Sequence, residues 1–177
     1  MRHWLEWLIL LSTLGSIQAG ELAAQYERFE AVTGKQIASP PRDTARGVEG
    51  ISEIAIERGP CFGPCPTYVY SVNSNGVAMY QGEANVEPIG RRTGRVPILS
   101  YARLAQFIRD SHYLTLPNSY SSSVTCGSAV YTRVTIGGRS KIIRNYRDAG
   151  PSTLWAVERL LDSLMQETVW DDIERAE

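Results

Sequence analysis

The segment that most constrains this chain is residues 61–68, Cys-Phe-Gly-Pro-Cys-Pro-Thr-Tyr, which holds two of the three cysteines and two of the nine prolines. Residues 51–58 before it alternate in the way typical of a strand, and residues 67–73 are rich in tyrosine and valine. Each proline fixes φ and so narrows the conformations open to the loop. We therefore interpret the segment as a stiff connection between two strands.

Further strands and helices follow from hairpin signals and apolar stripes. Asn75-Gly76 tolerates the positive φ of a type I′ turn and predicts that residues 77–82 return beside residues 67–73. Gly137-Gly138 predicts a second hairpin. Its strands would be residues 129–136 and 141–146, residues 85–96 would be irregular or a short edge strand, and residues 97–113 and the stretch after Gly150-Pro151 would be helices.

These elements predict an α+β fold with the order β-β-β-α-β-β-α. An antiparallel sheet of about five strands would carry two helices packed on one face. The domain would cover residues 51–170, after a flexible lead-in at 20–50 that holds a short helix near residues 21–32, and before an acidic tail at 171–177. Because the lead-in contains Pro40-Pro41 and lacks apolar periodicity beyond that helix, we expect folding not to require it.

The first 19 residues have the composition of a secretory signal peptide. A short basic start is followed by an apolar run over residues 7–17 and by the small residues Ala19 and Gly20. The run is shorter than the ~20 residues that span a bilayer. We expect an exported protein, periplasmic or secreted, with no stable membrane span after processing; an uncleaved anchor is the alternative. The formal net charge of -1 predicts no attraction to nucleic acid.

The sequence offers few residues for catalysis or metal binding. After removal of residues 1–19 the only histidine is His112, and no Gly-x-Ser-x-Gly motif is present. Three cysteines and one histidine occur in no recognised zinc spacing. We therefore predict no catalytic residue, no metal and no cofactor.

A cluster of arginines suggests an anion site. Arg91, Arg92 and Arg95 are flanked by glycines, and a turn of this kind can hold a phosphate or carboxylate. A second basic group, residues 139–147, would strengthen this hypothesis if the fold brought the two groups together. Otherwise each group is a charged, soluble face of the sheet.

The motif Cys-Phe-Gly-x-Cys-Pro-x-Tyr after an isoleucine-rich strand resembles a family of bacterial domains of unknown function, many of them on exported proteins. The resemblance spans roughly residues 50 to 170 and implies one domain. Thr125-Cys126-Gly127-Ser128 departs from the family pattern Thr-Asp-x-Pro, so any role of that aspartate is missing here. The resemblance therefore implies a fold but no established biochemical activity.

The three cysteines allow more than one disulfide. A Cys61–Cys65 bridge closes a short loop worth about 2 kcal/mol, whereas a bridge from either residue to Cys126 closes a long loop worth about 4 kcal/mol. Gly63 permits a tight turn, and Cys126 stands where the family has aspartate. We predict the Cys61–Cys65 bridge with Cys126 outside it, and the bridge to Cys126 is the alternative.

The function expected from the sequence is that of a non-enzymatic binding or structural module of the cell envelope, with an envelope partner or a small ligand that the residues do not identify. The alternative is a thiol–disulfide redox protein that uses Cys61 and Cys65. Reactive pairs are usually Cys-x-x-Cys at a helix N-terminus. Here three residues separate the cysteines and a strand is expected to follow, which favours a structural disulfide.

Overall fold

A computed structural model describes residues 24–25, 27–29, 50–123 and 126–171 of the chain. The predicted signal peptide, residues 20–23, 26 and 30–49 of the lead-in, and residues 172–177 of the acidic tail lie outside the described residues. Within the described part of the chain, no helix is long and apolar enough to cross a membrane.

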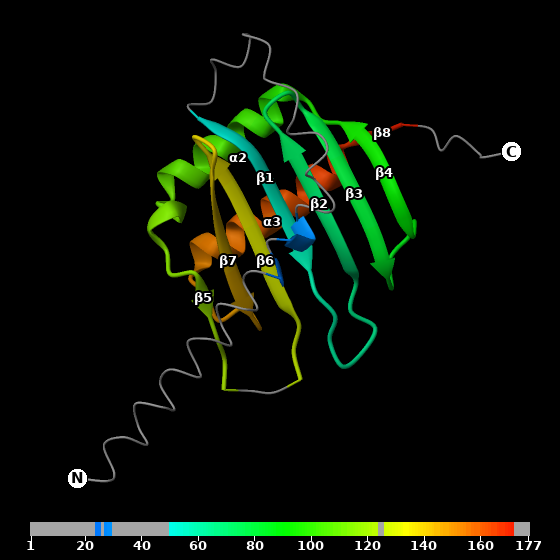
Figure 1. Ribbon diagram of the computed structural model, residues 1–177, viewed down its shortest axis with the longest axis vertical. Coiled ribbons are helices and arrows are strands. Elements are labelled where there is room, and N and C mark those ends of the chain that lie inside the picture. The colour runs from blue at the N-terminus through cyan, green and yellow to red at the C-terminus, as the bar shows by residue number, and fades with distance from the viewer. Residues whose placement is uncertain (1–23, 26, 30–49, 124–125, 172–177) are drawn as a thin grey trace, which may run out of the picture.

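The strands form one sheet in the order β5-β7-β6-β1-β2-β3-β4-β8 (Figure 1). Every neighbouring pair is antiparallel except β5 and β7, which are parallel. The strands are β1 (Ile51–Arg58), β2 (Thr67–Asn73), β3 (Val77–Ala84), β4 (Gly90–Arg95), β5 (Ser119–Tyr120), β6 (Ala129–Ile136), β7 (Arg139–Tyr146) and β8 (Val169–Trp170). The helices with described bounds are α2 (Ile98–Asp110), the 3-10 helix η1 (Tyr113–Thr115) and α3 (Ser152–Glu167).

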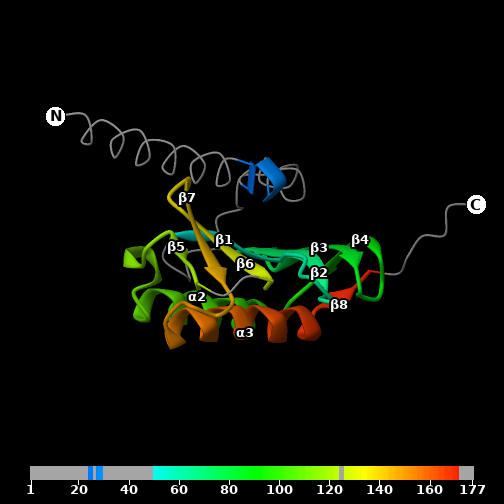
Figure 2. The same ribbon diagram turned by 90° about the horizontal axis from the view of Figure 1, so that it is seen from below.

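Helices α2 and α3 lie on one face of the sheet, and the helical residues 24–25 and 27–29 lie on the other (Figure 2). Apolar side chains from α2, α3 and alternate positions of the central strands form the main core. Asp162 of α3 ties that helix to the sheet, because it accepts hydrogen bonds from Arg58 Nη2 (2.5 Å) and from the Tyr68 hydroxyl (2.6 Å). The position of α3 over β1 and β2 is therefore fixed by charge as well as by apolar burial.

The predicted fold is wrong in its sheet and in its helical cover. The sheet is mixed and has eight strands, rather than antiparallel with about five. Strand β4 has no apolar alternation, and β5 and β8 have two residues each, so none of them carries the pattern that predicts a strand. Helical structure also occurs on both faces, since residues 24–25 and 27–29 lie opposite α2 and α3.

The two predicted hairpins are present, but the type I′ turn is in the second. Gly76 has a φ of 73° while Asn75 does not have a positive φ, and Gly76 N–H donates to the Asn73 carbonyl (2.9 Å). This is the three-residue loop in which one glycine takes the left-handed conformation. Gly137 and Gly138 both have positive φ, 55° and 75°, as a type I′ turn requires.

The second face of the sheet contains a small core of its own. Phe29 is fully buried and packs with Ala55, Val69 and Tyr131. Its ring lies 4.9 Å from the guanidinium carbon of Arg133, which is itself fully buried and paired with Glu53. Part of the lead-in therefore covers a buried ion pair, and whether folding requires the lead-in stays a prediction that unfolding measurements can check.

Candidate functional site

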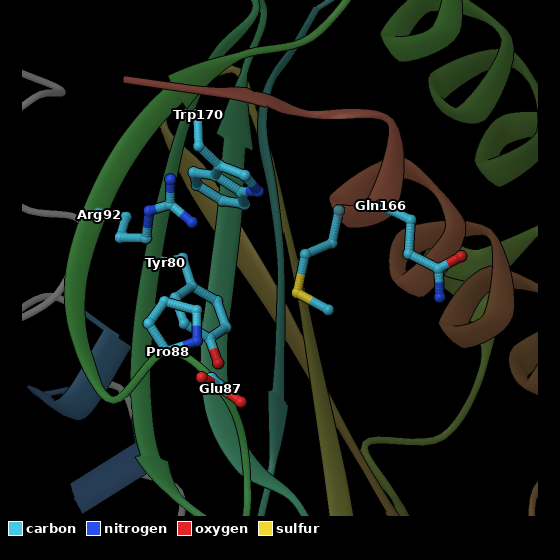
Figure 3. A pocket seen from close by; sticks show the side chains of 7 residues that line it. Tyr80, Glu87, Pro88, Arg92, Gln166 and Trp170 are labelled. Atoms are coloured by element: carbon cyan, nitrogen blue, oxygen red, sulfur yellow. The ribbon is translucent and has the colours of Figure 1, made fainter. Parts of the chain in front are cut away.

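The candidate site is a hollow of about 190 Å³ on the face of the sheet that carries α3. Figure 3 shows its walls: the rings of Tyr80 and Trp170, the guanidinium of Arg92, and Pro88 and Glu87 beside the hydroxyl end of Tyr80. We call it the aromatic hollow and define it by Tyr80, Glu87, Pro88, Arg92, Met165, Gln166 and Trp170.

The register of β3 and β4 places two of these side chains next to each other. Tyr80 pairs directly with Arg92 in the antiparallel ladder. Directly opposite residues project from the same face of a sheet, and Tyr80 belongs to the core beneath α2 and α3. Arg92 is therefore held against the apolar core rather than on the solvated face.

Trp170 reaches the hollow through the turn that follows α3. Thr168 closes the helix: its hydroxyl donates to the Leu164 carbonyl (3.0 Å) and lies 3.0 Å from the Tyr70 hydroxyl. Strand β8 then pairs with β4, with Trp170 opposite Gly94. A Cβ on Gly94 would lie 2.6 Å from the Val169 carbonyl oxygen, so this close approach requires glycine.

The rim of the hollow is supported by the disulfide loop. The connection between β3 and β4 carries Glu87 and Pro88, and a Cβ on Gly82 would lie 2.3 Å from the Pro88 carbonyl oxygen. At the start of this connection Asn85 Nδ2 donates to the Cys65 carbonyl (3.0 Å). The connection is thus packed against β3 at one point and bonded to the β1–β2 loop at another.

The charges in the aromatic hollow are incompletely paired. The Arg92 guanidinium carbon lies 5.4 Å from the centre of the Trp170 ring, a cation–π arrangement. Among the described residues its Nε is buried and has no hydrogen-bond partner. Burial raises the pKa of the Tyr80 hydroxyl, and the nearby Arg92 charge opposes that rise. The hollow therefore contains a neutral phenol, that of Tyr80, and a cation, Arg92, whose Nε is available as a hydrogen-bond donor.

A larger hollow on the opposite face, about 520 Å³, contains ion pairs between its own lining residues. Arg28 Nε lies 2.7 Å from Glu57, and Arg28 Nη2 lies 2.6 Å from Glu83. Gln25 also donates to Glu57. Burial raises the pKa of Glu57, with the Arg28 charge opposing the rise. The one arginine in the described lining of this hollow is thus already paired with two carboxylates, so, unlike the aromatic hollow, it offers no unpaired cation to an anionic ligand.

The structure separates the arginines that the sequence grouped. Arg92 faces the hollow, whereas Arg91 and Arg95 pair with Gln81 and Val77 and project from the other face. The second basic group is on and beside β7, five strand spacings from β4, or roughly 24 Å. The two basic groups do not converge, and anion binding by the predicted trio as a unit loses its geometric basis.

The cysteines are arranged as the sequence favoured. Cys61 and Cys65 form a disulfide with Cα atoms 5.6 Å apart, and Cys126 is exposed and lies outside it. The loop presents Phe62 with 92% of its surface exposed. The disulfide is followed by strand β2 and not by a helix. Over the described ranges, no cluster of His, Cys, Asp or Glu side chains could hold a metal ion.

Sequence reasoning named only Arg92 among the residues of the aromatic hollow. Trp170 packs against the main core, whereas Val169 is exposed. The alternation of β4 contains the signal that separates Arg92 from Arg91, but only once β4 is known to be a strand. No local pattern indicates that Glu87 and Trp170 line the same hollow.

A comparison with curated proteins finds no match. A comparison with protein families matches residues 52–165 to a domain of unknown function, DUF6438. The match confirms the resemblance to a domain of unknown function, although it does not establish the cysteine motif as the signature of that family. Gln166 and Trp170 lie beyond the matched residues, and the other five lining residues of the aromatic hollow lie within them. The chain belongs to the DUF6438 family of domains of unknown function.

Proposed function

We propose that this protein is an exported, non-enzymatic binding module and that the aromatic hollow is its binding site. The observation that carries the proposal is the buried Nε of Arg92, which lacks a partner among the described residues while aromatic rings surround it. A hollow with apolar walls and a few placed polar groups is the usual form of a small-ligand site. Its described lining contains no serine, cysteine or histidine that would serve as a nucleophile or base.

Trp170 provides the reporter for a direct test. In the full chain we would replace Trp4, Trp7 and Trp155 by phenylalanine, which leaves Trp170 as the only indole. Titration with benzyl alcohol, a neutral aromatic probe, should change the Trp170 emission along a saturable curve. A Trp170→Phe variant of the otherwise unaltered chain should lose binding in calorimetry. A response to benzyl alcohol that stays linear with concentration would contradict a binding hollow.

Export is supported by the disulfide, because disulfides persist in oxidising compartments outside the cytosol. The signal-like sequence before Gly20 supports the same conclusion. Mass spectrometry of the protein from its native host should give a chain that starts near Gly20. A cytosolic species that retains Met1 would argue against export.

A redox function remains the second candidate because the Cys61–Cys65 bridge is present. Its surroundings favour a structural role, since no helix N-terminus follows to stabilise a thiolate. We expect the bridge to stay oxidised in glutathione buffers near the poise of an oxidising compartment. Rapid, reversible cycling of the pair there would favour the redox protein over the binding module.

A further inference from the structure

We infer that the group bound in the aromatic hollow is a monocarboxylate attached to an apolar or aromatic body. This inference rests on the proposed function and adds the chemical class of the ligand. It comes from three features of the hollow: the orientation of Arg92, the size and polarity of the walls, and the charge at the rim.

The Arg92 guanidinium has a donor available for an anion. Its central carbon lies over the Trp170 ring, 5.4 Å from the ring centre, and its buried Nε is a donor without an acceptor among the described residues. Arginine binds a carboxylate through two parallel hydrogen bonds, which are about twice as strong as those between neutral groups. Because the guanidinium already lies against the Trp170 ring in the absence of a ligand, we expect less conformational entropy to be lost on binding.

The residues and the volume of the aromatic hollow determine the size and polarity of the part of the ligand that carries the carboxylate. Tyr80, Pro88, Met165 and Trp170 offer mainly apolar surface. A dry apolar cavity of about 150 Å³ holds one benzene-sized molecule. The aromatic hollow, at about 190 Å³, has room for one ring with a short substituent. The rings of Trp170 and Tyr80 are in T-shaped contact, with their centres 5.8 Å apart. An aromatic ligand could therefore contact two rings that lie at different angles.

The rim limits the ligand to one negative charge. Glu87 is exposed and lies beside the hydroxyl end of Tyr80 (Figure 3). A second carboxylate, or a doubly charged phosphate, would meet this like charge while Arg92 is the only cationic side chain in the lining. Glu87 is therefore a specificity residue against dianions.

Four probes of similar size separate these features. In the full chain with Trp170 as the only tryptophan, we would titrate benzyl alcohol, phenylacetate, phenethylamine and phenylmalonate. Phenylacetate should bind at least about tenfold more tightly than benzyl alcohol, as expected for a charge-assisted hydrogen bond. Phenethylamine and phenylmalonate should each bind more weakly than phenylacetate.

Matched variants assign the effect to individual residues. Arg92→Gln should remove the preference for phenylacetate over benzyl alcohol. Arg91→Gln is the control, since it removes the same charge from the next residue on the other face and should leave the preference intact. Glu87→Gln should bring phenylmalonate close to phenylacetate. Arg92→Lys, which keeps the charge and loses the paired donors, should retain only part of the preference. A partial preference in Arg92→Lys would show that the Arg92→Gln variant has lost carboxylate recognition and not its fold.

The outcomes separate the inference from the function on which it rests. If benzyl alcohol does not bind, the proposed function fails together with the inference. If benzyl alcohol binds and phenylacetate binds no more tightly, the carboxylate inference is overturned while the binding hollow stands. An equal loss in Arg91→Gln and Arg92→Gln would show a general charge effect and would also overturn it.

Discussion

Replacement of Phe29 by alanine should destabilise the whole domain, although Phe29 lies in the segment that the sequence marks as a lead-in. The ring is fully buried among Ala55, Val69 and Tyr131. It also covers the fully buried Arg133, which pairs with Glu53. The mutation therefore creates a cavity and opens a charged pair to water at the same point.

The expected loss in the free energy of unfolding is about 3 kcal/mol. Replacement of a buried phenylalanine by alanine costs roughly 3–5 kcal/mol, through lost transfer energy and the cavity. A desolvated cation–π contact such as that with Arg133 adds up to about 2 kcal/mol. The cluster is small and lies near the surface helix, so the site can partly collapse, and the lower end of the range applies.

Urea unfolding followed by circular dichroism measures this loss. Glu27→Ala is the matched control, because Glu27 is exposed on the same helical segment and should change stability by no more than about 0.5 kcal/mol. A Phe29→Ala loss below about 1 kcal/mol would refute the assignment of this helix to the core. A chain that begins at Gly50 and unfolds at an unchanged urea concentration would refute it as well.

Three further predictions concern the hollow, the disulfide and a buried acid. Gly94→Ala should detach β8 and shift Trp170 emission to the red while the far-ultraviolet circular dichroism is kept; unchanged emission would contradict the close approach. Replacing Cys61 and Cys65 together by serine should lower the free energy of unfolding by about 2 kcal/mol in urea unfolding, as expected for so short a loop. Burial raises the pKa of Glu158 to about 7 from 4.5, so the folded state binds this proton more tightly and stability should fall, by up to roughly 3 kcal/mol, as pH rises from about 4.5 through 7. Glu158→Gln should flatten that slope in unfolding measured across this pH range, and an unaltered slope would assign it to other groups.

The central strands were predictable because their local patterns match their environment. Strands β1, β2 and β6 begin and end where alternation and β-branched content place them. Asn75-Gly76 predicted the β2–β3 hairpin, although the turn uses one left-handed glycine and not two. These elements depend on contacts between residues near in sequence or on burial alone, and both produce a pattern that can be recognised in the amino-acid sequence.

The outer strands were not predictable in the same way. Strand β4, Gly-Arg-Arg-Thr-Gly-Arg, has a composition that disfavours a strand by propensity, and it forms because β3 offers a free edge beside it. Strands β5 and β8 contain two residues each and exist only through their partners β7 and β4. Tertiary pairing therefore overrides local preference at both margins of the sheet.

The candidate site lies at one of these margins, which explains why sequence reasoning found only part of it. Reading residues 91–95 as a turn groups Arg91 with Arg92, whereas a strand sends them to opposite faces. That one change replaces a general basic cluster by a single arginine in cation–π contact with Trp170. Trp170 in turn is held by a two-residue strand whose approach requires Gly94. The hollow thus depends on contacts between residues about 80 positions apart, and its ligand preference should be lost in any variant that releases β8, even where the central strands stay folded.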